Sequence, residues 1–285
     1  MKLNELLPGV CALLCTLNNE RDIEGVLSSL LESSPDQIIV VDGSSTDRTV
    51  ELAKKYTKDV FVTKIGFVHQ IAKGVDEVKY NHLLCIESDH RYPKGFIQNL
   101  KLEFDQSNFC GVQATLVCNF ERNFFERGLS SFYKIHQIKK GKKEIIGGPA
   151  IYKTEVFREY FKPKIAGFST DTQVAETARS LGLTFGLGYT TASQYEPMDI
   201  NRFLTKYMTY GHGDYFFYTG MAPQWSFSRK LKSVTHIAKR YFFHYPALAI
   251  IKLDFEGAAF LVMAGMVRYY GWSKTYLKKQ LGHYD

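Results

Sequence analysis

Short apolar runs alternate with amphipathic stretches through the first third of the chain. The runs at 10–17, 37–41, 60–65 and 82–86 have the length and composition of buried strands. Helical patterns fill the intervals at about 21–33, 46–56 and 70–78. Buried strands that alternate with helices predict an α/β fold, with a mainly parallel sheet covered by helices on both faces.

The pattern continues less regularly up to about residue 182. We expect a helix at 96–105, a strand at 110–119, a basic helical stretch at 120–146 and a short strand at 150–152. A further helix is expected at 171–181, where Gly182 ends it. The sequence contains no internal repeat and no low-complexity linker, so nothing in it suggests a string of separate modules.

The C-terminal part has a different character, with two apolar runs at 241–251 and 257–267. A membrane-spanning helix needs about 20 apolar residues, and neither run is that long. Basic residues flank both runs: Arg229, Lys230, Lys232, Lys239, Arg240, Arg268, Lys274, Lys278 and Lys279. This arrangement favours an in-plane anchor on an anionic leaflet. The alternative is a buried helical hairpin that packs on the rest of the chain or forms a dimer contact.

Charge and composition narrow the class of partner. The formal net charge is +7, which favours a polyanionic partner such as nucleic acid, anionic lipid or a phosphorylated small molecule. Zinc-ligand pairs and the aromatic signature of RNA-binding sheets are absent from the sequence, so we expect no nucleic acid. The basic residues flank apolar segments instead, which favours lipid.

The cysteines and the N-terminus bear on the compartment. The five cysteines are an odd number without a C-x-x-C pair, and several lie in apolar runs, as buried free thiols do. We therefore expect a reducing compartment. The first apolar run leads directly into a strand pattern, so a cleavable signal peptide is not expected. The expected location is cytoplasmic, peripheral on the cytoplasmic face of a membrane.

Polar residues follow three of the predicted strands. They are Asn18 with Glu20, then Asp42, then Glu87 with Asp89. Open α/β sheets bind ligands beyond the carboxyl ends of their strands. Carboxylates two residues apart in extended chain project to one side, and Mg²⁺ or Mn²⁺ prefers such hard oxygen ligands. Short acidic turns are common, however, and the Glu87-Ser88-Asp89 sequence gains its meaning only from its place after a strand.

Four stretches together resemble a known family. They are V-C-A-L-L-C-T-L-N-N-E from residue 10, I-I-V-V-D-G-S-S-T-D-R-T from residue 38, H-L-L-C-I-E-S-D-H-R-Y-P-K-G-F from residue 82 and S-T-D-T-Q-V-A-E-T-A-R-S-L-G from residue 169. In this order and spacing they resemble the family 2 inverting glycosyltransferases, which have a GT-A fold and use nucleotide-sugar donors. The resemblance extends over roughly residues 8–220.

The resemblance implies roles for particular positions. Asp89 matches the direct metal ligand of the family's D-x-D segment, with Glu87 nearer the ribose or the waters of the metal. Asp171 matches the general base that deprotonates the acceptor hydroxyl. The residues that would bind the nucleotide sugar are Thr16, Asn18, Glu20, Asp42, Glu87, Ser88 and Lys206. Asp42 would accept hydrogen bonds from the nucleobase. The implied cofactor is Mg²⁺ or Mn²⁺, and the implied donor is of the UDP or GDP type.

The chain departs from the family pattern in three places. Thr170 stands where a Glu usually precedes the base, and residues 70–74 lack the usual Arg-Asn pair. Residues 206–213 only loosely resemble the loop that closes over the donor phosphates. If this segment is that loop, Arg202 or Lys206 would clamp the diphosphate. His212 would complete the metal shell or touch the acceptor, although a histidine between glycines is more often an ordinary loop residue.

Rival interpretations fit the sequence less well. A nucleotidyltransferase or a dinucleotide-binding dehydrogenase would have a glycine-rich turn after the first strand, and residues 17–20 contain no glycine. Asp171 can also be explained as part of a helix cap. A catalytically inactive, membrane-associated scaffold with the same fold remains as the alternative function, and Thr170 is its support.

These observations predict an inverting glycosyltransferase. The catalytic domain is expected at 1–220 and a C-terminal amphipathic, membrane-associating helical region at 221–285. The acceptor is expected to be a hydroxyl of a glycan or of a lipid-linked sugar, in the synthesis of cell-envelope polysaccharide.

Overall fold

A computed structural model describes residues 6–162, 170–195 and 197–282. The chain divides into two compact units. The first comprises 1–116, 139–164 and 171–195, and the second comprises 117–138, 165–170 and 196–285. The compact units therefore do not follow the predicted division at residue 220. The extent of a catalytic domain over 1–220 stays a prediction about function.

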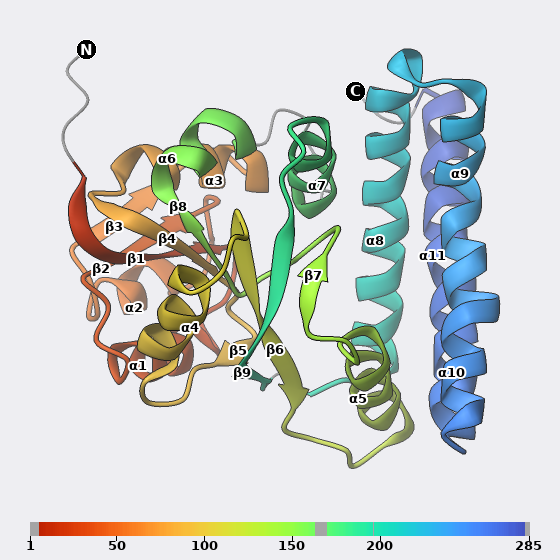
Figure 1. Cartoon of the computed structure of the whole chain (residues 1–285), viewed down its shortest axis with the longest axis horizontal. Coiled ribbons are helices and arrows are strands. Elements are labelled where there is room, and N and C mark those ends of the chain that lie inside the picture. Colours follow the sequence, from red (N-terminus) through yellow and green to blue (C-terminus); the bar gives the residue numbers. More distant parts are fainter. Residues whose placement is uncertain (1–5, 163–169, 196, 283–285) are drawn as a thin grey trace. The chain divides into compact units, whose positions relative to one another are not determined.

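The first unit is built on a mixed sheet (Figure 1). Within the described residues the strands lie in the order β3-β2-β1-β4-β8-β6-β9-β5, and β7 pairs with β9. The four strands from β3 to β4 are mutually parallel, whereas the pairs β4–β8, β6–β8, β5–β9 and β7–β9 are antiparallel. The strands are β1 (Leu7–Thr16), β2 (Gln37–Asp42), β3 (Asp59–Val62), β4 (Tyr80–Ile86), β5 (His90–Arg91), β6 (Gly111–Cys118), β7 (Gly141–Lys143), β8 (Ala150–Lys153) and β9 (Phe185–Gln194).

Helices cover this sheet and supply its core. Leu13 and Val41 on the sheet and Val75 on a helix belong to one buried apolar cluster, and a Cβ at Gly74 would meet Leu13. The helices are α1 (Ile23–Leu31), α2 (Thr49–Ala53), α3 (Phe67–Glu77), α4 (Phe96–Asp105), α6 (Thr154–Val156), which continues into the π turn η1 (Phe157–Phe161), and α7 (Thr170–Ser180). The α/β fold predicted from the sequence is confirmed.

Two predicted elements differ from the structure for local reasons. The helix expected at 46–56 is only the short α2, because Asp47 accepts a hydrogen bond from the backbone N–H of Thr49 and holds the preceding residues in a turn. The helical stretch expected at 120–146 ends at His136. Gly141 beyond it has a φ of +82°, a conformation that ends helices, and β7 begins there.

β9 is a strand that the apolar pattern did not predict. Its glycines interrupt the alternation, yet each makes room for a neighbour. A Cβ at Gly186 would collide with the ring of Phe109, and one at Gly188 would collide with the Glu103 carboxylate. These positions need glycine for close packing, so the sequence of β9 lacks the regular alternation that identifies a strand.

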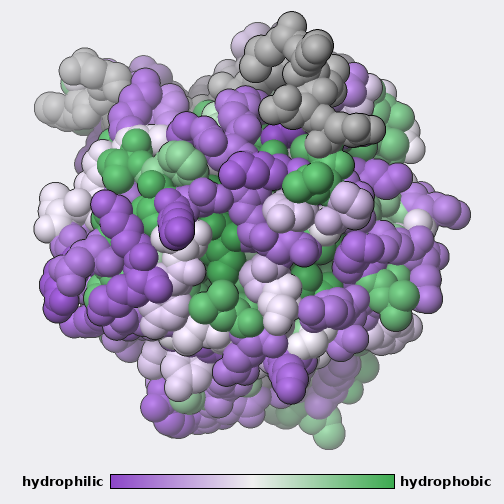
Figure 2. All heavy atoms as spheres, turned by 90° about the vertical axis from the view of Figure 1, so that its left-hand side faces the viewer, coloured by the Kyte–Doolittle hydropathy of each residue, from purple (hydrophilic) through white to green (hydrophobic). Residues whose placement is uncertain are grey.

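Hydrophilic residues cover most of the face that Figure 2 shows, which is the left-hand side of Figure 1. Hydrophobic residues appear there in small, separated patches. Scattered apolar groups of this kind are normal on a protein surface.

The second unit is helical (Figure 1). Its elements are α5 (Phe124–His136), α8 (Ile200–Met221), η2 (Ala222–Gln224), α9 (Phe227–Ala238), the π-helical η3 (Lys239–His244), α10 (Tyr245–Ile251) and α11 (Phe255–Gln280). No helix in the described part of the chain is long and apolar enough to cross a bilayer. Aromatic side chains form part of the core of this unit. The ring centroids of Phe203, Tyr207 and Phe260 lie 5.0–5.9 Å apart.

α8 and α11 pack against each other through glycines. A Cβ at Gly211 would lie 1.9 Å from the backbone oxygen of Arg268, and one at Gly271 would lie 2.4 Å from that of Met208. The backbones therefore approach as closely as glycine allows. Arg268 also forms a bidentate ion pair with Asp214 of α8, at 2.5 and 2.8 Å.

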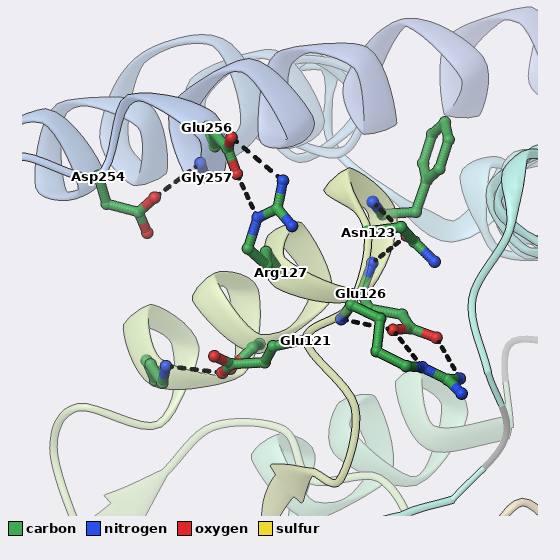
Figure 3. Close-up of polar contacts among 11 residues, drawn as sticks. Glu121, Asn123, Glu126, Arg127, Asp254, Glu256 and Gly257 are labelled. Atoms are coloured by element: carbon green, nitrogen blue, oxygen red, sulfur yellow. Dashed lines mark hydrogen bonds and ion pairs between the residues drawn. The ribbon is translucent and has the colours of Figure 1, made fainter.

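Polar contacts fix the start of α11 (Figure 3). The Asp254 side chain caps the helix by accepting from the N–H of Gly257, at 2.8 Å. Glu256 pairs with Arg127 of α5 at 2.6 Å. Asn123 in turn caps α5 by accepting from the N–H groups of its first turn.

The five cysteines are free thiols. Burial raises the pKa of every one of them, to about 12 for Cys85 and about 11 for Cys110. At neutral pH they are protonated, weakly nucleophilic groups, which agrees with the packing role expected from their apolar surroundings.

Candidate active site

Three parallel strands end together at one edge of the sheet. β1 lies between β2 and β4, with Thr16 paired to Asp42 and Leu14 paired to Ile86. The polar residues that follow β1, β2 and β4 therefore meet at the carboxyl edge, as the sequence predicts.

The loops after β1 and β2 are tied to each other by hydrogen bonds. Asn18 donates its N–H to the Ser45 hydroxyl at 2.7 Å, and its side-chain oxygen accepts from the N–H of Thr46 at 2.9 Å. The Glu20 carboxylate accepts from the N–H of Arg48 at 3.1 Å. Asn18 has a φ of +49°, which asparagine tolerates better than most residues. Asn18 and Glu20 thus hold the two loops in one arrangement.

Asp42 is fully buried at the end of β2. Its Oδ1 accepts from the N–H of Ser45 at 2.7 Å, and its Oδ2 accepts from the Ser45 hydroxyl. The buried Gln70 amide lies beside it and donates to the carbonyls of Thr16 and Val41, at 2.7 and 2.9 Å. Gln70 therefore joins the ends of β1 and β2 in the segment where the Arg-Asn pair is missing.

Two buried polar atoms at this edge lack a hydrogen-bond partner among the described residues. They are the hydroxyl oxygen of Thr16 and the side-chain nitrogen of Asn19. Buried polar groups are almost always hydrogen-bonded, by protein, water or ligand. Such groups at a strand end are suited to contact a polar ligand.

The residues after β4 form an acidic cluster. One ligand atom each of Glu87, Asp89 and His90 lies within 4.8 Å of the others. His90 Nδ1 is 3.0 Å from Asp89 Oδ1 and 3.4 Å from Glu87 Oε2. The Glu87 side chain is 49% exposed and that of Asp89 25%, whereas His90 is buried. Two accessible carboxylates therefore converge above a buried imidazole.

Residues distant in the sequence hold this cluster in place. Gln194, buried at the end of β9, donates its amide N–H to Asp89 Oδ2 at 2.8 Å, and the N–H of Tyr195 donates to the Asp89 carbonyl at 2.8 Å. The buried Tyr92 hydroxyl donates to the carbonyl of Glu87 and accepts from its N–H. Gln194 was not predicted as a support because it lies on β9, a strand that the apolar pattern does not indicate.

The turn before β8 also adjoins the cluster. A Cβ at Gly148 would come within 2.9–3.0 Å of three side-chain atoms of Glu87. Glycine at this position therefore gives the Glu87 side chain its room. The Gly147-Gly148-Pro149 turn is thus part of the wall of the acidic cluster.

Asp171 lies in the first turn of α7, in the same unit as the cluster. Its side chain is exposed, and Oδ1 accepts from the N–H of Thr172 at 2.9 Å. Its charge contributes to raising the pKa of the buried Tyr152, after the larger effect of burial and those of two cysteines. Ser169, which precedes this turn in the predicted motif, lies outside the described residues.

Lys206 and His212 lie on α8, in the second unit. The prediction of a loop at 206–213 is wrong, because this segment is the middle of a 22-residue helix whose Gly211 accommodates α11. His212 Nδ1 is 3.1 Å from the Thr275 hydroxyl of α11, and partial burial lowers the pKa of its ring. Arg202, in the first turn, donates to the carbonyl of Pro197 at 2.9 Å. These contacts give the segment a packing role in its own unit.

Parallel strands with polar ends, continued by antiparallel strands and bearing an acidic cluster after the fourth strand, define a glycosyltransferase of GT-A type. The chain belongs to the glycosyl transferase family 2, whose profile matches residues 11–161, more than half of its length. No curated protein matches it significantly.

Solved structures share the fold at low sequence identity. Glucosyl-3-phosphoglycerate synthase from Mycobacterium tuberculosis, in complex with Mn²⁺, UDP and glucosyl-3-phosphoglycerate, is 16% identical with a TM-score of 0.54. The match covers 75% of this chain and 79% of that one. S. aureus TarS is 12% identical with a TM-score of 0.54, over 82% of this chain and 44% of that one. TarS 1–349 is 14% identical with a TM-score of 0.50, over 97% and 92%.

Proposed function

We propose that this glycosyltransferase moves a sugar from a nucleoside diphosphate, of the UDP or GDP type, to an acceptor hydroxyl with inversion at the anomeric carbon. The observation that carries the proposal is the pair of accessible carboxylates, Glu87 and Asp89, at the strand edge shared with Thr16 and Asp42. A diphosphate needs a counter-charge, and the cluster lies where α/β sheets bind such ligands.

The cluster suits Mg²⁺ or Mn²⁺. Both ions accept carboxylate oxygens together with waters and phosphate oxygens, and one or two protein carboxylates are enough. A carboxylate has about four lone-pair positions, so the contacts of Asp89 with Gln194 and His90 leave it able to act as a ligand. Asp89 would be the direct ligand, and Glu87 would bind the ion or its waters. The bound cation would neutralise the charge that develops on the departing diphosphate.

Asp171 is proposed as the general base. The acceptor oxygen forms a bond to the anomeric carbon while the bond from that carbon to the diphosphate oxygen breaks, and the diphosphate leaves with the electron pair. The acceptor proton passes to the carboxylate of Asp171. A positioned base of this kind contributes about 10²–10⁴-fold.

The nucleotide would lie along the ends of β1 and β2. The buried Thr16 hydroxyl is suited to a ligand contact there, and Asn18 and Glu20 would act by fixing the loops that enclose the base. Asp42 would face the nucleobase across the turn that the Asp42 carboxylate stabilises. Ser88 would lie next to the ribose.

A screen of nucleotide sugars tests the proposal. The purified chain with Mn²⁺ is expected to hydrolyse one of them slowly in the absence of acceptor, and the Asp89→Asn variant is expected to lose this activity. Asp36→Asn is the matched control, because Asp36 directly precedes β2 and accepts from the N–H of Val10, away from the carboxyl ends of the strands. Failure of every UDP- and GDP-sugar, together with no Mn²⁺-dependent binding of UDP or GDP, would favour the inactive scaffold.

We further propose that the catalytic part is residues 1–220 and that residues 221–285 attach it to the cytoplasmic face of a membrane. The excess of basic residues in the C-terminal part supports this location. The acceptor would then be a lipid-linked sugar or glycan of the cell envelope. Loss of residues 229–285 should release the protein from the membrane fraction, and unchanged fractionation would contradict the proposed location.

A further inference from the structure

Exposed apolar residues recur along the solvent side of α11. At 100° per residue, eight exposed residues fall within a stripe about 80° wide, and all but Ser273 are apolar. The exposed fraction of the large apolar residues ranges from 37% for Met263 to 69% for Leu281. The apolar residues of the stripe are Phe255, Ala259, Met263, Met266, Tyr270, Leu277 and Leu281. The opposite side, with Phe260 and Gly271, is already buried in the unit. A surface helix normally shows mainly polar residues on its solvent side, whereas on this one apolar residues predominate in the stripe, and Glu256 and Lys274 border it.

The preceding helix also exposes large apolar residues. α9, η3 and α10 run on into one another, and a short turn at 252–254 joins them to α11 as a helical hairpin (Figure 1). Phe243 on η3 is 70% exposed, and Ile251 at the end of α10 is 76% exposed. Leu253 in the connecting turn is 78% exposed, and Phe255 follows at 64%. The exposed apolar residues of both limbs thus converge at the tip of the hairpin, which we define as Ile251, Leu253 and Phe255.

Leucine at position 253 is not explained by folding. Its φ of +59° belongs to the left-handed region, which glycine and asparagine adopt at lower cost. Its side chain is exposed, so burial does not favour leucine either. An apolar residue that is favoured neither by its backbone conformation nor by packing is best explained by contact with something outside the chain.

The charge of the hairpin identifies that partner. Residues 227–282 contain ten lysines and arginines but only two acidic residues, a formal net charge of +8 against +7 for the whole chain. Both acidic residues are engaged within the unit, since Asp254 caps α11 and Glu256 pairs with Arg127 (Figure 3). An exposed apolar stripe bordered by basic residues fits an anionic bilayer surface.

We propose that the solvent side of the α9–α11 hairpin is a lipid-binding surface, with its tip inserted among the headgroups of an anionic membrane. The inference rests on the membrane location proposed above and specifies which residues make the contact. The apolar side chains of the tip enter the interface, and the exposed basic residues along the limbs face anionic lipid; Arg268, paired with Asp214, takes no part. The catalytic cluster takes no part in this contact.

Co-sedimentation of the full chain with vesicles tests the surface. The wild type should bind vesicles that contain phosphatidylglycerol, and should bind less as salt increases or when the vesicles are phosphatidylcholine alone. The combined variant Ile251→Ser, Leu253→Asn and Phe255→Ser should bind about tenfold less tightly or weaker still, because three large apolar side chains are removed from the interface.

Leu253→Asn alone separates binding from folding. Asparagine suits the left-handed conformation, so the midpoint of thermal unfolding should stay or rise while vesicle binding weakens. Leu102→Asn is the matched control, because Leu102 is a 56% exposed leucine on α4 and its loss should leave vesicle binding unchanged.

Two results would contradict the proposed lipid-binding surface. One is wild-type vesicle binding by the tip variant. The other is a wild type that does not bind anionic vesicles but forms a dimer that the tip variant disrupts, because the stripe would then be an interface between copies.

Donor hydrolysis is measured on the same samples without vesicles. Vesicle binding without hydrolysis would contradict the proposed chemistry alone, and hydrolysis without vesicle binding would contradict the surface alone.

Discussion

Asp171 is a single exposed carboxylate at the start of α7 to which we assign the proton-accepting role. Asp171→Asn preserves shape and the contact with the Thr172 N–H but removes the base. Transfer should fall about 10²–10⁴-fold, while Mn²⁺-dependent nucleotide binding stays nearly unchanged. Initial rates of transfer and calorimetric titration with nucleotide measure the two quantities.

Asp76→Asn is the control for this change, because Asp76 is an exposed aspartate paired with Lys162 in the same unit. It should retain full transfer activity. A variant at Asp171 as active as the wild type would remove this residue from the mechanism and leave helix capping as its role.

Gln194 acts on the cluster from β9 through its hydrogen bond to Asp89. Gln194→Leu removes the donor while the backbone pairing of β9 with β5 remains. Loss of such a supporting contact typically weakens metal affinity about 10–100-fold. The Mn²⁺ concentration that gives half-maximal nucleotide binding should rise accordingly, with little change in binding at saturating Mn²⁺. An unchanged Mn²⁺ dependence would show that the hydrogen bond from Gln194 to Asp89 does not support metal binding.

The sequence located the two carboxylates but not their supports. Glu87 and Asp89 follow directly on an apolar run, so local pattern was sufficient to find them. Gln194 is more than a hundred positions further along the chain and reaches Asp89 only because β9 pairs with β5. Pairing of this kind depends on sheet topology, which hydrophobic periodicity does not determine.

At the scale of elements, the glycines of α8 give the clearest test of packing. A Cβ at Gly211 would lie 1.9 Å from a backbone oxygen of α11, and backbone cannot move aside as a flexible side chain can. Gly211→Ala should lower the free energy of unfolding by about 1–3 kcal/mol or more, even though alanine favours helix. Urea unfolding followed by circular dichroism measures the change.

Gly147→Ala is the comparison, because a Cβ there would meet nothing within 4 Å. It should change the free energy of unfolding by less than about 1 kcal/mol. Equal stability of the Gly211 variant and the wild type would contradict the close approach of α8 and α11.

The same glycines explain why a loop was predicted at 206–213. Glycine favours loops in sequence, but here it is selected by contact with a helix sixty residues away. Elements with uninterrupted local patterns were predicted well. α4 has the predicted bounds, and the C-terminal ends of β2 and β4 differ from prediction by no more than one residue. The missed strand β9 and the segment 206–213 contain glycines whose effect depends on distant partners, whereas the two shortened helices differ for local reasons.

At the scale of the whole molecule, the chain is a family 2 glycosyltransferase with a basic helical unit. If metal and nucleotide bind the cluster together, they should stabilise the folded chain only in combination. Nucleotide at about 100 times its Kd with Mn²⁺ present should add about 2.7 kcal/mol to the free energy of unfolding. The midpoint of thermal unfolding measured with both, with each alone and after chelation by EDTA tests this coupling. A rise with nucleotide alone that EDTA does not reverse would argue against a metal-dependent site.

The account depends most on Asp42, Asp89 and Asp171 facing one nucleotide-sugar site around a cation. Crystals grown with Mn²⁺ and the accepted nucleotide, measured at the manganese absorption edge, test this directly. We predict an anomalous peak in contact with Asp89 and the diphosphate. The nucleobase should lie near Asp42, and Asp171 should lie on the acceptor side. A peak elsewhere, or these three carboxylates around separate cavities, would contradict it.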